Sequence, residues 1–149
     1  MIKSTLVAAA LALSFASAAF AGPADDAIKA RQAYMKAHGA FMAVAVPVLK
    51  GEKPYDKATM DAALAADGAA GADWGKWWGA DTQKGETLET WAKPEIWTDA
   101  KGFEKAGTDF YNAYVTLTKA TDEASFKAAF GAFGGGCKTC HESFRRPKE

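Results

Sequence analysis

The chain has 149 residues, in which 18 lysines and arginines balance 18 aspartates and glutamates. This length predicts one domain that can bury a hydrophobic core of its own. The zero formal charge argues against nucleic-acid binding, which leaves a basic surface on a protein. The 2 cysteines exclude a disulfide-stapled scaffold, and together with the 2 histidines they could fill at most one zinc site.

Residues 1–21 are expected to be a secretory signal peptide. Lys3 supplies the positive end, an apolar run follows from Leu6 to Phe15, and Ala19-Phe20-Ala21 has the small-x-small pattern of a cleavage site. The apolar run is too short to span a bilayer, so an uncleaved membrane anchor is the weaker alternative. We therefore predict cleavage after Ala21, a mature domain of residues 22–149, and a periplasmic location without a membrane attachment.

The first part of the mature chain predicts two helices. An apolar stripe of helical period marks the first of them, formed by Ile28, Met35, Met42 and Leu49. Pro47 removes a hydrogen bond from this helix, which predicts a kink or an early end there. Asp56 can cap a second helix that runs to about residue 72.

Residues 73–97 show no clean periodicity and contain all five tryptophans, Trp74, Trp77, Trp78, Trp91 and Trp97. A connection this long in a small helical domain is expected to fold over the core as a lid. The rings could close one end of the domain, which is the commoner use of buried aromatic residues. They could also form an aromatic docking surface for a redox partner, and both interpretations stay open.

Two more amphipathic segments follow the tryptophan-rich connection. The third predicted helix runs from about Asp99 to Lys119, and its apolar stripe consists of Phe103, Gly107, Phe110, Tyr114 and Leu117. The fourth starts near Asp122, and its stripe consists of Phe126, Phe130, Phe133, Cys137, His141 and Phe144. Four amphipathic segments with short links, apart from residues 73–97, predict an all-α fold, an antiparallel four-helix bundle.

The segment Cys137-Lys138-Thr139-Cys140-His141 has the C-x-x-C-H pattern by which c-type haem is attached. On a helix, positions i, i+3 and i+4 share one face. Both sulfurs can therefore form thioether bonds to one haem, while His141 offers an imidazole nitrogen to the iron. Gly134, Gly135 and Gly136 precede the pattern, and each costs a helix about 0.5–1 kcal/mol relative to alanine. We expect close approach of haem or a neighbouring helix there, with fraying as the alternative.

Three other uses of the two cysteines compete with haem attachment. A thiol-disulfide oxidoreductase would place its reactive cysteine at a helix N-terminus in a βαβ unit, whereas this pair lies well along a helix. A zinc site would need His38 to converge with Cys137, Cys140 and His141, and the adjacent Cys140 and His141 make an awkward chelate. A structural disulfide would leave His141 on a core face without a purpose. Haem attachment is the favoured interpretation.

With these features, the whole mature chain resembles the cytochrome c′ family, the class II c-type cytochromes. The most specific mark is the placement of residues 137–141 near the C-terminus, followed by Phe144-Arg145. Supporting marks are residues 31–35 (RQAYM), 50–56 (KGEKPYD) and 94–97 (PEIW).

The resemblance implies roles for particular residues. Cys137 and Cys140 would hold one covalently bound haem c, and His141 would be the proximal iron ligand. Arg145 matches a basic residue near the proximal histidine, and Arg31 matches one near the haem propionates. Ordinary surface charge is the alternative for both arginines.

Met35 matches the family position that lies over the distal face of the haem. In some members the side chain there only covers the face and leaves the iron five-coordinate and open to small gases. In others a methionine binds the iron and gives a six-coordinate, low-spin electron carrier. The context of Met35-Lys36-x-x-Gly39, followed by residues 51–56, resembles the methionine-ligated branch. Met42 and His38 are weaker candidates for a distal role, and His38 is expected to face solvent.

We therefore expect a periplasmic c-type haem protein that carries single electrons, with His141 and Met35 as axial ligands. The alternative is a five-coordinate protein that binds nitric oxide or carbon monoxide at an open distal site. No nucleophile–base pair and no paired acids are evident, so no enzymatic activity is predicted. The expected partners are redox proteins or small gases and, as in some family members, a second copy of the chain, but neither nucleic acid nor a membrane.

Overall fold

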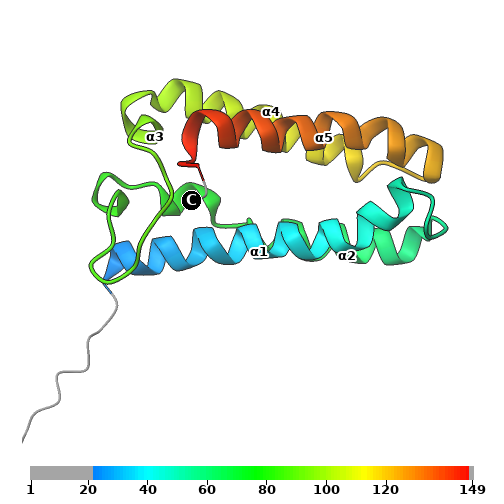
Figure 1. The fold of residues 1–149 in the computed structure, drawn as a ribbon, viewed down its shortest axis with the longest axis horizontal. Helices are drawn as coiled ribbons and strands as arrows, with labels where there is room; N and C mark the ends of the chain where they lie inside the picture. Colours follow the sequence, from blue (N-terminus) through cyan, green and yellow to red (C-terminus); the bar gives the residue numbers. More distant parts are fainter. Residues whose placement is uncertain (1–21, 148–149) are drawn as a thin grey trace, which may run out of the picture.

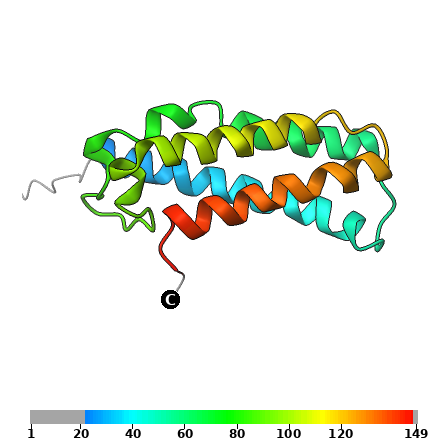
Figure 2. The same cartoon turned by 90° about the horizontal axis from the view of Figure 1, so that it is seen from above.

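The computed structural model describes residues 22–147, so the predicted signal peptide lies outside the described residues. Four long helices build the domain: α1 (Pro23–Leu49), α2 (Lys57–Ala70), α4 (Ala100–Leu117) and α5 (Glu123–Phe144). Helix α1 packs against α2 and α4 packs against α5, which gives two layers (Figure 1). The view turned by 90° shows the same helices running side by side along one long axis (Figure 2). The predicted antiparallel four-helix bundle is confirmed.

The ends of α1 follow from its sequence. Pro23 stands in the first turn, where a backbone N–H has no acceptor within the helix. The lack of an N–H in proline therefore costs this helix no hydrogen bond. At the other end the helix continues only two residues beyond Pro47, so the predicted early end is confirmed. Gly51 then adopts a φ of 73°, a left-handed conformation that glycine reaches without a steric penalty. This turn reverses the chain toward α2.

Each of the three later long helices begins at an aspartate whose side chain accepts a hydrogen bond from the backbone N–H three residues further on. These caps are Asp56, Asp99 and Asp122, with N–O distances of 2.8, 3.1 and 2.8 Å. Such a cap satisfies one of the N–H groups that a helix start leaves unpaired. The predicted cap at Asp56 and the predicted start at Asp122 are confirmed.

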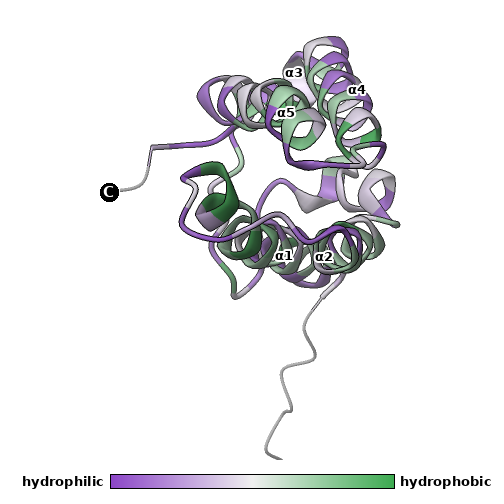
Figure 3. Cartoon of the chain, turned by 90° about the vertical axis from the view of Figure 1, so that its right-hand side faces the viewer, coloured by the Kyte–Doolittle hydropathy of each residue, from purple (hydrophilic) through white to green (hydrophobic). Residues whose placement is uncertain are grey.

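Two hydrophobic clusters hold the layers together. The larger fills the middle and the end of the bundle distant from residues 71–99, and its fully buried members include Phe41, Met60, Leu117, Phe126 and Phe133. The smaller lies at the opposite end and consists of Ile96, Phe103 and Phe144, with tryptophan rings packed against it. Seen along the bundle, the long helices carry hydrophobic and hydrophilic residues on different sides (Figure 3). This arrangement is the amphipathic pattern expected from the sequence.

Residues 71–99 cross the second end of the bundle in short turns: η1 (Trp74–Trp77), η2 (Ala80–Thr82) and α3 (Glu95–Thr98). Trp74, Trp78 and Trp97 pack against the smaller cluster, so these three rings close one end of the bundle, as one interpretation predicted. The indole N–H of Trp97 also donates to the carbonyls of Trp78 and Gly79, each at 3.0 Å.

A buried carboxylate ties the start of α1 to this connection. Asp25 is fully buried and accepts hydrogen bonds from the backbone N–H groups of Glu86, Thr87 and Leu88. Its second oxygen accepts from the Thr87 hydroxyl at 2.5 Å. These bonds, that of the Thr87 hydroxyl first, lower the pKa of Asp25 below its ordinary value of 3.8.

Candidate haem site

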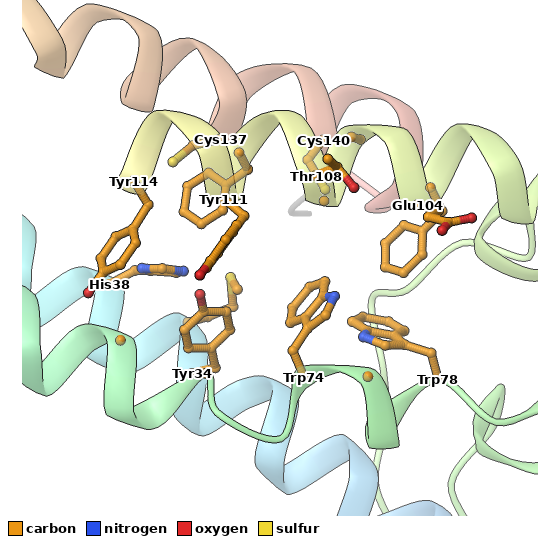
Figure 4. Close-up of a pocket in the computed structure, with 18 of the residues that line it drawn as sticks. Tyr34, His38, Trp74, Trp78, Glu104, Thr108, Tyr111, Tyr114, Cys137 and Cys140 are labelled. Carbon is orange, nitrogen blue, oxygen red and sulfur yellow. The ribbon is translucent and has the colours of Figure 1, made fainter. Parts of the chain in front are cut away.

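A cavity of about 740 Å³ lies between the two layers, at the end that residues 71–99 close. Its walls come from α1, α2, η1, α4 and α5, and Figure 4 shows how their side chains converge on it. Most of these side chains are aromatic, or glycine and alanine. Sites for cofactors usually have volumes of about 300–1,000 Å³ and mainly apolar walls. The cavity therefore has the size and character of a cofactor site.

Helix α5 presents the C-x-x-C-H residues to this cavity. Cys137, Cys140 and His141 all line it, which confirms that the three side chains share one helical face. Both thiols are free, and burial raises the pKa of each. A raised thiol pKa is the opposite of what a thiol-disulfide oxidoreductase needs at its reactive cysteine.

His141 is held in the form that binds a metal. Burial lowers its pKa below 6.5, and the positive charge of Arg145 and the proximity of His38 lower it further. The imidazole is therefore neutral at pH 7 and has a nitrogen lone pair to offer. Arg145 itself is exposed directly after α5, and its backbone N–H donates to the His141 carbonyl at 3.2 Å. The structure thus places Arg145 close to His141 along the chain, and a role beside the haem stays an expectation from the family resemblance.

The three glycines before Cys137 stand inside an unbroken helix, so fraying is the wrong explanation for them. A Cβ atom on Gly136 would lie 3.3 Å from the Phe110 side chain and 3.4 Å from the Phe110 Cα. Helix α4 therefore approaches α5 closely at Gly136. Gly135 has no neighbour within 4 Å of the Cβ position, and Gly134 has one at 3.7 Å. Close approach explains one of the three glycines.

Helix α1 forms the wall opposite α5. Met35 lines the cavity and is 39% exposed. His38 lines it too, although the sequence predicted a solvent-facing residue; that prediction is wrong, because the His38 side chain is 14% exposed. Residues three apart share one side of a helix, so His38 turns inward with Met35. Its Nδ1 lies 2.6 Å from Oδ1 of Asp67, a residue of α2 that the sequence did not single out.

Arg31 is buried, so ordinary surface charge is the wrong interpretation for this residue. Its Nη2 donates to the Thr82 carbonyl at 2.6 Å, and its Nε donates to the Ala27 carbonyl at 3.3 Å. The guanidinium lies 4.7 Å from the ring centroid of Trp78 and 5.9 Å from that of Trp97, which is within cation–π range.

Two buried donors at this place have no hydrogen-bond partner among the described residues: Nη1 of Arg31 and Nε1 of Trp78. Buried polar groups in native proteins are nearly always paired, so each such group needs an explanation. Trp78 lines the cavity and Arg31 lies against the Trp78 ring, so an acidic group of a bound molecule at this place would offer these donors an acceptor. The family resemblance implied a place for Arg31 near the propionates but gave no signal for Trp78, because the position of its indole nitrogen depends on the folded path of residues 71–99.

These residues fit a haem c group. The site offers two free thiols for thioether bonds, a neutral imidazole for iron, an apolar cavity of suitable volume and two unpaired donors for propionates. Among residues 22–147, no group of three or more histidines, cysteines, aspartates or glutamates is arranged to hold a metal ion, which argues against the zinc alternative there.

Comparison with known proteins supports this fit. A family model described as cytochrome c′ matches residues 26–145. Cytochrome c′ from Alcaligenes xylosoxydans xylosoxydans is 35% identical over 133 residues, which cover 87% of this chain and 99% of the relative. Cytochrome c-556 from Rhodopseudomonas palustris is 36% identical, covering 97% of each chain.

Solved structures show the same likeness. The nitric oxide complex of a mutant of cytochrome c prime from Alcaligenes xylosoxidans matches with a TM-score of 0.73 and 33% identity, covering 87% of this chain and 99% of that one. Cytochrome c′ from Rubrivivax gelatinosus matches with a TM-score of 0.74 and 31% identity, covering 83% of this chain and 97% of that one.

Proposed function

The chain belongs to the cytochrome c′ family, and from this premise we propose that it binds a small gas such as nitric oxide at an open distal face of its haem. Proteins of this family carry one covalently bound haem c, and Cys137 and Cys140 are the cysteines that hold it in this chain. When bound, the haem supplies an iron that has one position for a protein ligand and one for a diatomic gas.

The observation that carries the proposal is the likeness, over 87% of the chain, to a cytochrome c prime of which a mutant was solved as its nitric oxide complex. The shape of the cavity supports it as well. The cavity reaches from His141 on α5 to Met35 on α1, so it continues on the side away from the proximal histidine. These findings support the five-coordinate alternative better than the electron carrier that we expected from the sequence.

We assign the following roles to the residues of this chain. His141 would hold the iron from the proximal side, because its imidazole is neutral and buried beside both attachment cysteines. Arg31 and Trp78 would donate to a propionate through the nitrogens that have no partner among residues 22–147. Met35 would cover the distal face and limit the size of the ligand. We assign no catalytic residue, and the protein binds its ligand without chemical turnover.

A second candidate function is electron transfer with Met35 as the sixth ligand. The observation that favours it is the position of Met35, a thioether side chain on the cavity wall that α1 forms opposite His141. A thioether ligand stabilises ferrous iron and raises the reduction potential, which suits an electron carrier. The electron donor and acceptor would be other proteins.

We also propose that the protein works in the periplasm, because residues 1–21 have the pattern of a cleaved signal peptide. In residues 22–147, no helix has the length and apolar character needed to cross a bilayer.

The two functions differ in what Met35 does, so the test compares the reduced holoprotein with its Met35→Ala variant during carbon monoxide and nitric oxide titrations. Gas binding predicts that the unmodified protein binds both gases directly and that Met35→Ala only speeds their entry. The variant Met42→Leu, further along α1, is the control. A protein that binds carbon monoxide only after Met35 is replaced would contradict gas binding and support electron transfer.

A further inference from the structure

We propose that His38 is a hydrogen-bond donor to the gas bound on the distal face, and that Asp67 is the positioning residue that aims its ring. This inference rests on the proposed function and deepens it. The sequence predicted a distal face lined by Met35 and a solvent-facing His38. The structure instead brings a histidine–aspartate pair, one residue from α1 and one from α2, to the wall of the same cavity.

The carboxylate of Asp67 is the first reason. It is 1% exposed, and neither of its oxygens has a hydrogen-bond partner among residues 22–147. The imidazole of His38, with Nδ1 2.6 Å from Oδ1, is the group that the described residues place within ion-pair distance of it. A buried carboxylate without a charged or hydrogen-bonding partner is strongly unfavourable. His38 is therefore the side chain that compensates the buried carboxylate of Asp67.

The remaining ring nitrogen is the second reason. With Nδ1 facing Asp67, Nε2 is the ring nitrogen of His38 that remains for a ligand, and we assign the donating N–H to it. The ring is fixed by aromatic neighbours, with its centroid 4.2 Å from that of Tyr34 and 5.3 Å from that of Phe110. Figure 4 shows the ring extending from α1 into the pocket, beside Tyr34. No described residue accepts a hydrogen bond from it.

The chemistry of the ligand is the third reason. A diatomic gas on ferrous iron receives electron density from the metal and becomes a better hydrogen-bond acceptor at its outer atom. A hydrogen-bond donor in a cavity with mainly apolar walls acts more strongly on such a ligand than a donor in water does. One such hydrogen bond corresponds to as much as about tenfold in the rate of ligand dissociation.

The test measures the C–O stretching frequency and the dissociation rate of carbon monoxide from the reduced holoprotein. Replacing His38 alone would leave Asp67 unpaired and could unfold the protein, so the main variant replaces both, His38→Leu with Asp67→Leu. We expect the double variant to bind carbon monoxide with a higher stretching frequency and to release it about tenfold faster. In the Asp67→Leu background, His38→Gln, which keeps an N–H donor, should restore part of both shifts. Met42→Leu, on α1 but not among the residues that line the cavity, should leave both unchanged.

The outcomes that would contradict the proposal distinguish a failure of the His38 inference from a failure of the gas-binding function. If carbon monoxide binds and the double variant has the same stretching frequency and release rate, His38 donates nothing and this inference fails, while gas binding stands. If the unmodified protein binds no carbon monoxide, both fail. If the unmodified protein is six-coordinate and becomes five-coordinate in the double variant, His38 is itself an iron ligand and its role as a donor is overturned.

Discussion

The guanidinium carbon of Arg31 lies 4.7 Å from the centroid of the Trp78 ring, and each of these two side chains ends in a buried nitrogen without a hydrogen-bond partner among the described residues. The pair joins the start of α1 to the tryptophan-rich connection. It also leaves two donors for an acidic group at the edge of the cavity. One contact thus stabilises the fold and prepares the site.

Replacing Arg31 with alanine should lower the free energy of unfolding by about 1.5–3 kcal/mol, because the charged hydrogen bond to the Thr82 carbonyl and the contact with Trp78 are both lost. Urea denaturation of the holoprotein measures this change. The exposed Lys29, whose ion pair with Asp26 is 3.6 Å long, gives the control, and Lys29→Ala should stay within about 0.5 kcal/mol of the parent. Equal stability of the two variants would contradict the structural role of Arg31.

The lowered pKa of Asp25 predicts how the free energy of unfolding depends on pH. Its pKa is lowered in the folded state, so the stability that it provides is fully present above its ordinary value of 3.8 and is lost as the pH falls through the lower, folded-state pKa. Asp25→Asn should reduce stability at pH 7 and flatten the loss between about pH 5 and pH 2. Urea midpoints measured at several pH values test this, and parallel curves for the two proteins would refute it.

Gly135 and Gly136 offer a matched pair of substitutions on α5. Gly135→Ala should stabilise the holoprotein by about 0.5–1 kcal/mol, because alanine favours a helix and the Cβ position is open. Gly136→Ala should gain less or lose stability, because its Cβ meets Phe110 at 3.3 Å. Thermal unfolding of both variants measures the two changes in stability. A larger increase in stability for Gly136→Ala than for Gly135→Ala would show that α4 does not constrain position 136.

The sequence predicted well those features that depend on neighbours along the chain. Helical spacing placed Cys137, Cys140 and His141 on one face, and the aspartate at position 56 predicted the start of α2. Such signals arise within one or two turns of a helix. Local patterns of this kind are therefore sufficient to predict the bundle and the attachment site.

The sequence did not predict the features that depend on contacts between distant residues. His38 turns inward because Asp67 lies on the neighbouring helix, in an alanine-rich stretch where nothing marks it as a partner. The burial of Arg31 depends on Trp78 and Trp97, which meet it only when residues 71–99 fold over the end of the bundle. Periodicity describes one helix at a time, so it cannot report pairings between elements.

The mature holoprotein should have the mass of residues 22–149 plus one haem, and the haem should stay attached under denaturing conditions. Thioether bonds survive unfolding, whereas a coordinated haem is lost. Mass spectrometry of protein matured with a competent haem-attachment system tests both the cleavage after Ala21 and the attachment. The double variant Cys137→Ser with Cys140→Ser should lose the haem on denaturation, and its retention would contradict thioether attachment.

The most direct test of an open distal face is the coordination state of the iron, read from the optical and resonance Raman spectra of the purified protein. The spectra are recorded in the ferric and ferrous forms, before and after carbon monoxide. We predict a high-spin, five-coordinate ferrous protein whose spectrum changes on adding carbon monoxide. A low-spin, six-coordinate spectrum with a sulfur-to-iron charge-transfer band, indifferent to carbon monoxide, would contradict gas binding and place Met35 on the iron.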